Sequence, residues 1–217
     1  MQMKQHYQGH CRGVLKYDMK ISIYISVLFY IILSGCDLFS TRIPEPPDTG
    51  RSGFLPPTTA TIALTNLINA VKEKNSENFL ACLSDSTSGY LSFTFTPSTE
   101  ALAKFPGKFN LWNKYSEQRS YNSILAALKQ DEKPELTFNT GTNDFEVLTS
   151  DSAVFYSDYY LKMPHNKDAI PTEFSGTVQF TLYLVKQRWS ISRWVDISSF
   201  EDSSKYSWSI LKANFAD

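Results

Sequence analysis

The chain has 217 residues, a formal net charge of −1 at pH 7, 42% hydrophobic residues and 20% charged residues. This length suits one domain with appended segments, and the composition excludes a disordered chain and a membrane protein with several spans. Because a near-neutral chain is poorly suited to hold a phosphate backbone, we expect no nucleic-acid partner.

An apolar segment lies close to the N-terminus. Residues 21–33 read ISIYISVLFYIIL, and Lys16 and Lys20 precede or border them. A helix over these residues would span about 20 Å, which is short of the roughly 30 Å hydrocarbon core of a bilayer. The length and the positive flank therefore indicate a signal peptide. A start at Met19 would give a compact signal, so we hypothesise that translation begins there.

The apolar run ends in Leu33-Ser34-Gly35-Cys36. An apolar residue, two small residues and a cysteine at this place resemble the lipobox of bacterial lipoproteins. The resemblance implies cleavage between Gly35 and Cys36 and lipidation of the Cys36 thiol, which would attach the mature chain to a bilayer. The alternative is an ordinary N-terminal membrane anchor. We expect residues 1–35 to be a signal peptide of a lipid-anchored protein of the bacterial cell envelope. The sequence leaves open which membrane, inner or outer.

Residues 36–57 are predicted to form the lipidated end and a tether. Seven of the 20 residues in 38–57 are Pro or Gly, and the prolines favour an extended polyproline conformation. The alternative is an ordered arm in which Phe54 and Leu55 dock on the domain. The domain itself is predicted to occupy residues 58–217.

Helices are expected in the first half of this domain. Thr58 or Thr59 can cap the first helix, and a second short helix begins at Ser76. The first helix carries one apolar stripe, made of Leu64, Leu67, Ile68 and Val71. A strand follows at 90–95, and a third helix covers about 117–129. Between them the pattern is mixed, and an aromatic plug is expected from Leu111, Trp112 and Tyr115.

From Glu135 onward the hydrophobic period becomes two, which indicates half-buried antiparallel strands. The expected strands are 135–139, 144–149, 153–163, 173–186 and 189–198. The last two form a hairpin that turns at Gln187-Arg188, with strict alternation of faces through 189–198. Gly176 marks a bend. A short C-terminal helix is expected from the spacing of Trp208, Leu211 and Phe215.

This order of elements resembles the NTF2-like superfamily, also called cystatin-like or SnoaL-like. The segment KEKNSENFLACLSD resembles the opening of that fold, and GTVQFTLYLVKQRWSISRWVDIS resembles its terminal hairpin. The resemblance covers about residues 58–200 and implies an α+β cone, with N-terminal helices packed on a curved antiparallel sheet. It also implies a cavity between the sheet and the helices. Because the superfamily includes isomerases, dehydratases, hydrolases and non-catalytic binding modules, the fold leaves the activity open.

The residues give little support for a metal site or for nucleophilic catalysis. Once the signal is removed, His165 is the one histidine of the domain and Cys82 its one thiol, so we expect no metal site and no cofactor. His165 is expected to be an exposed loop residue, and Cys82 a buried packing thiol. Asp196 and Arg193 fall on opposite faces of one strand, and we expect each to face water and to form an ion pair across the sheet rather than to act in catalysis.

Asp158 is a weak candidate for catalysis, with Tyr156 and Tyr160 on the same face of its strand. If this face lines the cavity, Asp158 can act as a general base; if it faces water, Asp158 is expected to pair with a cation across the sheet. No catalytic residue is therefore assigned. The preferred function is non-catalytic binding of an envelope protein or a small apolar ligand. The alternatives are a cavity enzyme of isomerase or hydrolase type and a structural homodimer formed through the open sheet face.

Overall fold

The computed structural model describes residues 24, 52–89, 91–199 and 206–216, apart from the side chain of Ser88. The chain divides into two units, residues 1–50 and 51–217, and the second unit carries the helices and the sheet of the domain. Gly35, Cys36 and most of the predicted signal peptide lie outside the described residues. In the part of the chain that is described, no helix is long and apolar enough to cross a membrane.

The domain opens with two helices, α2 (Ala60–Lys72) and α3 (Ser76–Ala81). The Thr59 side chain accepts a hydrogen bond from the backbone N–H of Ile62 and so caps α2, as predicted. The predicted apolar stripe of α2 faces the core. Phe79 of α3 stacks on the ring of Tyr121, with the ring centroids 3.8 Å apart. These contacts confirm the two predicted helices.

The segment before α2 lies along that helix. Leu55 N donates to Asn66 Oδ1 over 2.9 Å, and Asn66 Nδ2 donates back to Leu55 O over 2.7 Å. Gly53 N donates to Glu73 Oε1 over 2.6 Å. Phe54 packs against the core, whereas Leu55 is exposed. Residues 52–57, which we expected to belong to the tether, therefore form an ordered arm on the domain.

The middle of the chain contains a short 3-10 turn, a strand and two helices. These are Ser86–Ser88 (η2), β1 (Thr94–Thr96), α4 (Thr99–Lys104) and α5 (Lys114–Ala127). Trp112 is buried beside Phe95 and Phe109, but Leu111 and Tyr115 are 88% and 65% exposed. The expectation that Leu111 and Tyr115 form part of a plug is therefore wrong. Asn113 starts α5 three residues before the predicted helix because its side chain caps the helix.

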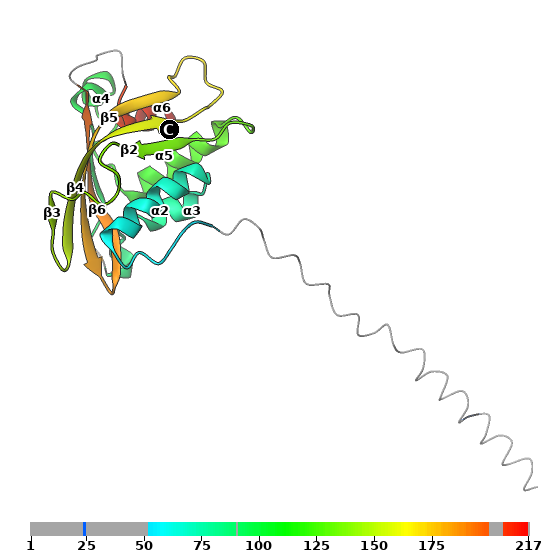
Figure 1. Cartoon of the computed structure of the whole chain (residues 1–217). Coiled ribbons are helices and arrows are strands. Elements are labelled where there is room, and N and C mark those ends of the chain that lie inside the picture. The colour runs from blue at the N-terminus through cyan, green and yellow to red at the C-terminus, as the bar shows by residue number, and fades with distance from the viewer. Residues whose placement is uncertain (1–23, 25–51, 90, 200–205, 217) are drawn as a thin grey trace, which may run out of the picture. The chain divides into compact units, whose positions relative to one another are not determined.

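A six-stranded sheet forms the second layer. Its strands are β1, β2 (Glu135–Phe138), β3 (Val147–Leu148), β4 (Ser152–Lys162), β5 (Glu173–Val185) and β6 (Arg188–Ser198). Their order is β1-β6-β5-β4-β2. Strand β3 also pairs with β4, along a different part of β4 from the part that pairs with β2. The helices cover one face of the curved strands (Figure 1). This architecture confirms the predicted α+β fold class. The sheet is not purely antiparallel as expected, because β1 pairs with β6 in parallel.

A β-bulge divides β6. In the β5–β6 pairing, Thr181 lies opposite Arg193 but the next residue, Leu182, lies opposite Ile191, so Ser192 is an extra residue in β6. Because the bulge shifts the inward positions by one, the strict alternation predicted through 189–198 is wrong. The hairpin turns at Lys186-Gln187, one residue earlier than predicted.

The C-terminal helix α6 (Trp208–Phe215) is almost wholly buried, and it packs on α5, α4 and β5. Close packing also explains Gly176. A Cβ at this position would collide with the carbonyl oxygen of Ile197 and lie 3.1 Å from the Tyr159 hydroxyl. Gly176 is thus required by the close approach of β6 and Tyr159 to β5.

Candidate functional site

The residues predicted as weak catalytic candidates lie on the sheet face that is turned away from the core. Along β4, Phe155 and Tyr159 are buried, whereas Tyr156 and Asp158 are exposed and Tyr160 is half-buried. Asp158 therefore faces water and does not line an interior cavity. A general base works best in a site that excludes water, and the exposed carboxylate of Asp158 has no such shelter.

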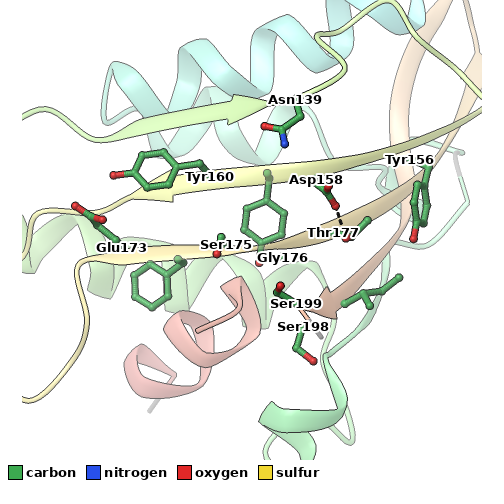
Figure 2. A pocket seen from close by; sticks show the side chains of 13 residues that line it. Asn139, Tyr156, Asp158, Tyr160, Glu173, Ser175, Gly176, Thr177, Ser198 and Ser199 are labelled. Carbon is green, nitrogen blue, oxygen red and sulfur yellow. Dashed lines mark hydrogen bonds between the residues drawn. The ribbon is translucent and has the colours of Figure 1, made fainter. Parts of the chain in front are cut away.

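An open groove of about 740 Å³ runs over this outer face. The residues that line it come from the neighbouring strands β4, β5 and β6, with Asn139 at the end of β2 (Figure 2). Across the sheet, Thr177 Oγ1 donates a 2.6 Å hydrogen bond to Asp158 Oδ1. The cross-sheet partner of Asp158 is thus a hydroxyl group and not the expected cation. This bond fixes the direction of one carboxylate oxygen and leaves the rest of the carboxylate open to the groove.

The two ends of the groove differ. Figure 2 shows Tyr160 beside Glu173 at one end and Tyr156 at the other. Partial burial and the hydrogen-bonded Glu173 carboxylate raise the pKa of Tyr160. The groove therefore offers two carboxylates, several hydroxyls and two aromatic rings to a ligand that approaches from solvent.

The space between the sheet and the helices holds a buried acid that the sequence pattern did not indicate. Asp196 is 1% exposed, and its Oδ1 accepts a 2.9 Å hydrogen bond from the Tyr159 hydroxyl. Its Oδ2 accepts from the backbone N–H of Ser209 over 2.6 Å and from the Ser209 hydroxyl. Burial raises the pKa of Asp196, and the bonds from Ser209 and Tyr159 oppose that rise. Burial and the neighbouring Asp196 raise the pKa of Tyr159 well above its usual value.

A buried cation lies close to this acid. Lys212 of α6 is 1% exposed, and its Nζ lies 2.5 Å from Glu117 Oε1 of α5. Its ammonium group also lies 3.4 Å from the ring centroid of Trp194 and 4.0 Å from that of Phe95. Burial lowers the pKa of Lys212, and Glu117 opposes that change. Trp112 Nε1 donates to the second oxygen of Glu117 over 2.7 Å.

These buried groups hold the C-terminal helix in the interior of the fold. Trp208, Ser209 and Lys212 of α6 each contact a polar group of the sheet or of α5. The sequence contained a signal for Lys212, because it follows Trp208 by four residues and so shares the apolar side of that helix. Asp196 had no such signal, because the bulge in β6 reverses its expected side.

Two further expectations concern His165 and Cys82. His165, expected to be exposed, is 3% exposed: its Nε2 donates to Pro171 O over 3.0 Å and its ring contacts Phe215. The polar sequence around it misled the prediction, since the loop folds back over the end of α5. Cys82 is buried as predicted, and burial raises the pKa of its thiol to about 12. Among the described residues, no group of three or more His, Cys, Asp or Glu side chains could hold a metal ion.

No protein-family model and no curated protein matches the sequence. The chain is similar in structure to an NTF-2 like protein of unknown function from Shewanella oneidensis MR-1, at 13% identity, with a TM-score of 0.41 over 63% of this chain and 93% of that one. It is also similar to a ketosteroid isomerase-like protein from Erwinia carotovora atroseptica, at 13% identity, with a TM-score of 0.43 over 64% of this chain and 92% of that one. A protein with a cystatin-like fold from Nostoc punctiforme shows 10% identity and a TM-score of 0.40, over 66% of this chain and 88% of that one. Similarity at this level carries no information on activity.

Proposed function

We propose that the protein is a lipid-anchored protein of the bacterial cell envelope, and that its NTF2-like domain is a non-catalytic binding module. The lipobox-like sequence that ends in Cys36 supports the anchor. The main support for a binding function is the location of the groove, which lies on the solvent side of the sheet. Buried side chains of α6 and β6, among them Trp208, Lys212 and Trp194, lie in the interior, where a cavity enzyme would hold its substrate.

The chemistry of the groove fits recognition better than catalysis. Electrostatic catalysis depends on a site that excludes water, because water screens the charges that stabilise a transition state. Asp158 is exposed, so it can accept hydrogen bonds from a ligand without the shelter that acid–base work requires. We propose that the ligand, a partner segment or a small molecule, donates hydrogen bonds to Asp158 and Glu173 and lies against the ring of Tyr156.

The anchor is tested by labelling cells with a palmitate analogue. The wild-type chain is expected to incorporate the label and to sediment with membranes, and Cys36→Ala is expected to lose the label. Cys82→Ala is the matched control, since Cys82 is buried in the domain and should leave labelling unchanged. Equal labelling of the wild type and Cys36→Ala would overturn the lipid anchor.

The binding face is tested with a photo-crosslinking amino acid placed at Tyr156 of the full chain in living cells. A defined product, identified by mass spectrometry, is expected from Tyr156 and should weaken when Asp158→Ala is added. The control position is Tyr115, which is exposed on α5 away from the groove. A product of twice the chain mass would identify the partner as a second copy. No product from Tyr156, or the same product from Tyr115, would overturn the groove as the binding face.

A further inference from the structure

A second hollow lies at the turn of the β5–β6 hairpin. It has a volume of about 470 Å³ and is formed by the end of α3, the loop that follows it, the first residue of α5 and the turn itself. None of its lining residues belongs to the outer groove. A ligand in this hollow would therefore touch none of the groove residues, and it would not require the lipid anchor.

The charges of this pocket are unbalanced. In the described part of the chain, Lys114, Lys186 and Arg188 line it together with one carboxylate, that of Asp85. Lys114 Nζ lies 3.4 Å from Asp85 Oδ2 and donates to Leu83 O over 3.1 Å. Hydrogen bonds from Thr87 and the nearby Lys114 lower the pKa of Asp85, so this carboxylate stays charged at neutral pH. Among the described residues that line the pocket, positive side chains therefore outnumber negative ones by two.

The fold holds these cations in place. Lys186 and Gln187 adopt positive φ angles of 48° and 62°, as expected for a two-residue hairpin turn, so Lys186 is the first residue of the turn and Arg188 directly follows it. The Lys186 ammonium lies close to Gly89, since a Cβ on Gly89 would be 3.4 Å from Lys186 Nζ. Ser84 N donates to Ile191 O over 2.8 Å and ties the loop to the hairpin. The turn and this hydrogen bond therefore fix the backbone from which Lys186 and Arg188 extend.

A buried hydroxyl in the wall gives an independent indication of a ligand. Ser84 lines the pocket and is 2% exposed, and its Oγ has no hydrogen-bond partner among the described residues. A buried hydroxyl without a partner costs about 1–3 kcal/mol, so most such groups in folded proteins are satisfied. An oxygen-rich anion in this pocket would supply the acceptor.

We propose that this pocket binds a phosphate group, held by Lys114, Lys186 and Arg188, with the Ser84 hydroxyl as an additional donor. Phosphate fits these groups because it carries up to two negative charges and several acceptor oxygens, and because a guanidinium group can bind two of those oxygens at once. The pocket is larger than a phosphate ion, so the phosphate belongs to a larger molecule. That molecule is either a soluble phosphomonoester or the headgroup of a phospholipid.

The test is a titration of the full chain in neutral detergent, followed by the amide NMR signals of Ser84 and Arg188. Inorganic phosphate and glycerol 3-phosphate probe the soluble source, and dihexanoyl phosphatidylglycerol probes the headgroup; dihexanoyl phosphatidylcholine is the zwitterionic comparison. Saturable shifts are expected with at least one of the three anionic probes. The probe that binds most tightly identifies the source of the phosphate.

Variants make the test specific. Arg188→Gln and Lys186→Gln are each expected to weaken binding about tenfold, through loss of a charge-assisted contact. Lys108→Gln, which removes an exposed cation outside the pocket, should leave binding unchanged. Asp85→Asn should strengthen binding, because it removes the one competing carboxylate, and Asp151→Asn is its matched control. Absence of saturable binding, or equal losses in Lys108→Gln and Arg188→Gln, would overturn the proposal.

Discussion

Lys212 Nζ lies 2.5 Å from Glu117 Oε1 in the interior of the domain, where neither side chain is more than 2% exposed. The pair joins the C-terminal helix α6 to α5. Taking two charges out of water costs several kcal/mol each, and only their mutual attraction and further contacts repay that cost. Here Trp112 bonds to the second carboxylate oxygen and the ring of Trp194 faces the ammonium. The position of α6 thus depends on this pair remaining complete.

Removing one partner of this pair is expected to destabilise the domain strongly. Lys212→Met leaves the Glu117 carboxylate buried without its cation, and Glu117→Gln leaves the Lys212 ammonium without its anion. Each variant should lower the free energy of unfolding by about 3–5 kcal/mol. Urea denaturation followed by tryptophan fluorescence measures the change directly, since Trp194 and Trp208 both lie beside Lys212.

Two controls separate this effect from a general loss of charge. Lys129→Met breaks an exposed pair, with Lys129 Nζ 3.1 Å from Glu132 Oε1, and should cost no more than about 1 kcal/mol. The double variant Lys212→Met with Glu117→Leu leaves neither member of this pair behind as a lone buried charge and should recover part of the stability. If Lys212→Met costs no more than Lys129→Met, the pair does not hold α6 in place.

A second prediction concerns the hydroxyl of Tyr159, which joins β4 to both β6 and α6. It donates to Asp196 Oδ1 and accepts from Trp208 N over 2.6 Å. Tyr159→Phe would leave both groups without this partner in the core, and the expected cost is about 1–3 kcal/mol per buried group left unpaired. Tyr156→Phe is the matched control, because it removes a hydroxyl from the same strand on its exposed face and should change stability by less than about 0.5 kcal/mol. Equal effects of the two substitutions on the urea midpoint would contradict this role.

The described helices other than α4 (Thr99–Lys104), and most strands, could be predicted from the sequence because local chemistry determines them. Thr59 starts α2 as a capping residue, and the period-two pattern of β5 matches its burial along the whole buried face. The parallel pairing of β1 with β6 could not be predicted, because a three-residue strand carries no local sign of its direction. Local pattern thus determined the elements, and long-range pairing determined their arrangement.

The candidate site was harder to predict because it depends on which sheet face is buried. Along β4 both faces carry aromatic residues, so the sequence could not decide between Tyr156 and Tyr159 as the inward residue. For Asp196 the inserted Ser192 reverses the expected side, and a bulge is set by strand pairing rather than by composition. Burial of His165 likewise comes from a tertiary contact, with Phe215, that no local pattern shows.

The close approach at Gly176 gives a third prediction. A Cβ at this position would collide with the backbone carbonyl of Ile197, so β5 and β6 would have to move apart in Gly176→Ala. Overpacking of this kind typically costs about 1–3 kcal/mol. The control is Gly141→Asn: Gly141 has a φ of 75°, which asparagine tolerates, and nothing lies within 4 Å of its added Cβ. A Gly176→Ala chain as stable as Gly141→Asn in thermal unfolding would show that the strands can absorb the methyl group.

The last prediction is a pH dependence that arises from His165. Its Nε2 donates to Pro171 O, while its Nδ1 accepts a 3.3 Å hydrogen bond from Lys167 N, and both bonds together require the neutral ring. Burial lowers the pKa of His165 in the folded protein, whereas the unfolded chain binds a proton at an ordinary pKa of about 6.5. Between these two values the unfolded chain holds more protons, so the free energy of unfolding falls as the pH decreases through 6.5, by at most about 1.4 kcal/mol per pH unit.

Urea denaturation at pH 7.5 and pH 5.5 tests this dependence by comparing the wild type with His165→Gln. The glutamine amide can still donate to Pro171 O but does not titrate, so the variant is expected to lose less stability than the wild type on acidification. Burial raises the pKa of Asp196, so Asp196 acts in the opposite direction, since the folded protein then gains protons as the pH falls. The contribution of Asp196 is common to both chains and cancels in the comparison. An identical pH dependence in the two chains would contradict the role assigned to His165, because it would mean that the buried ring is not the group that titrates.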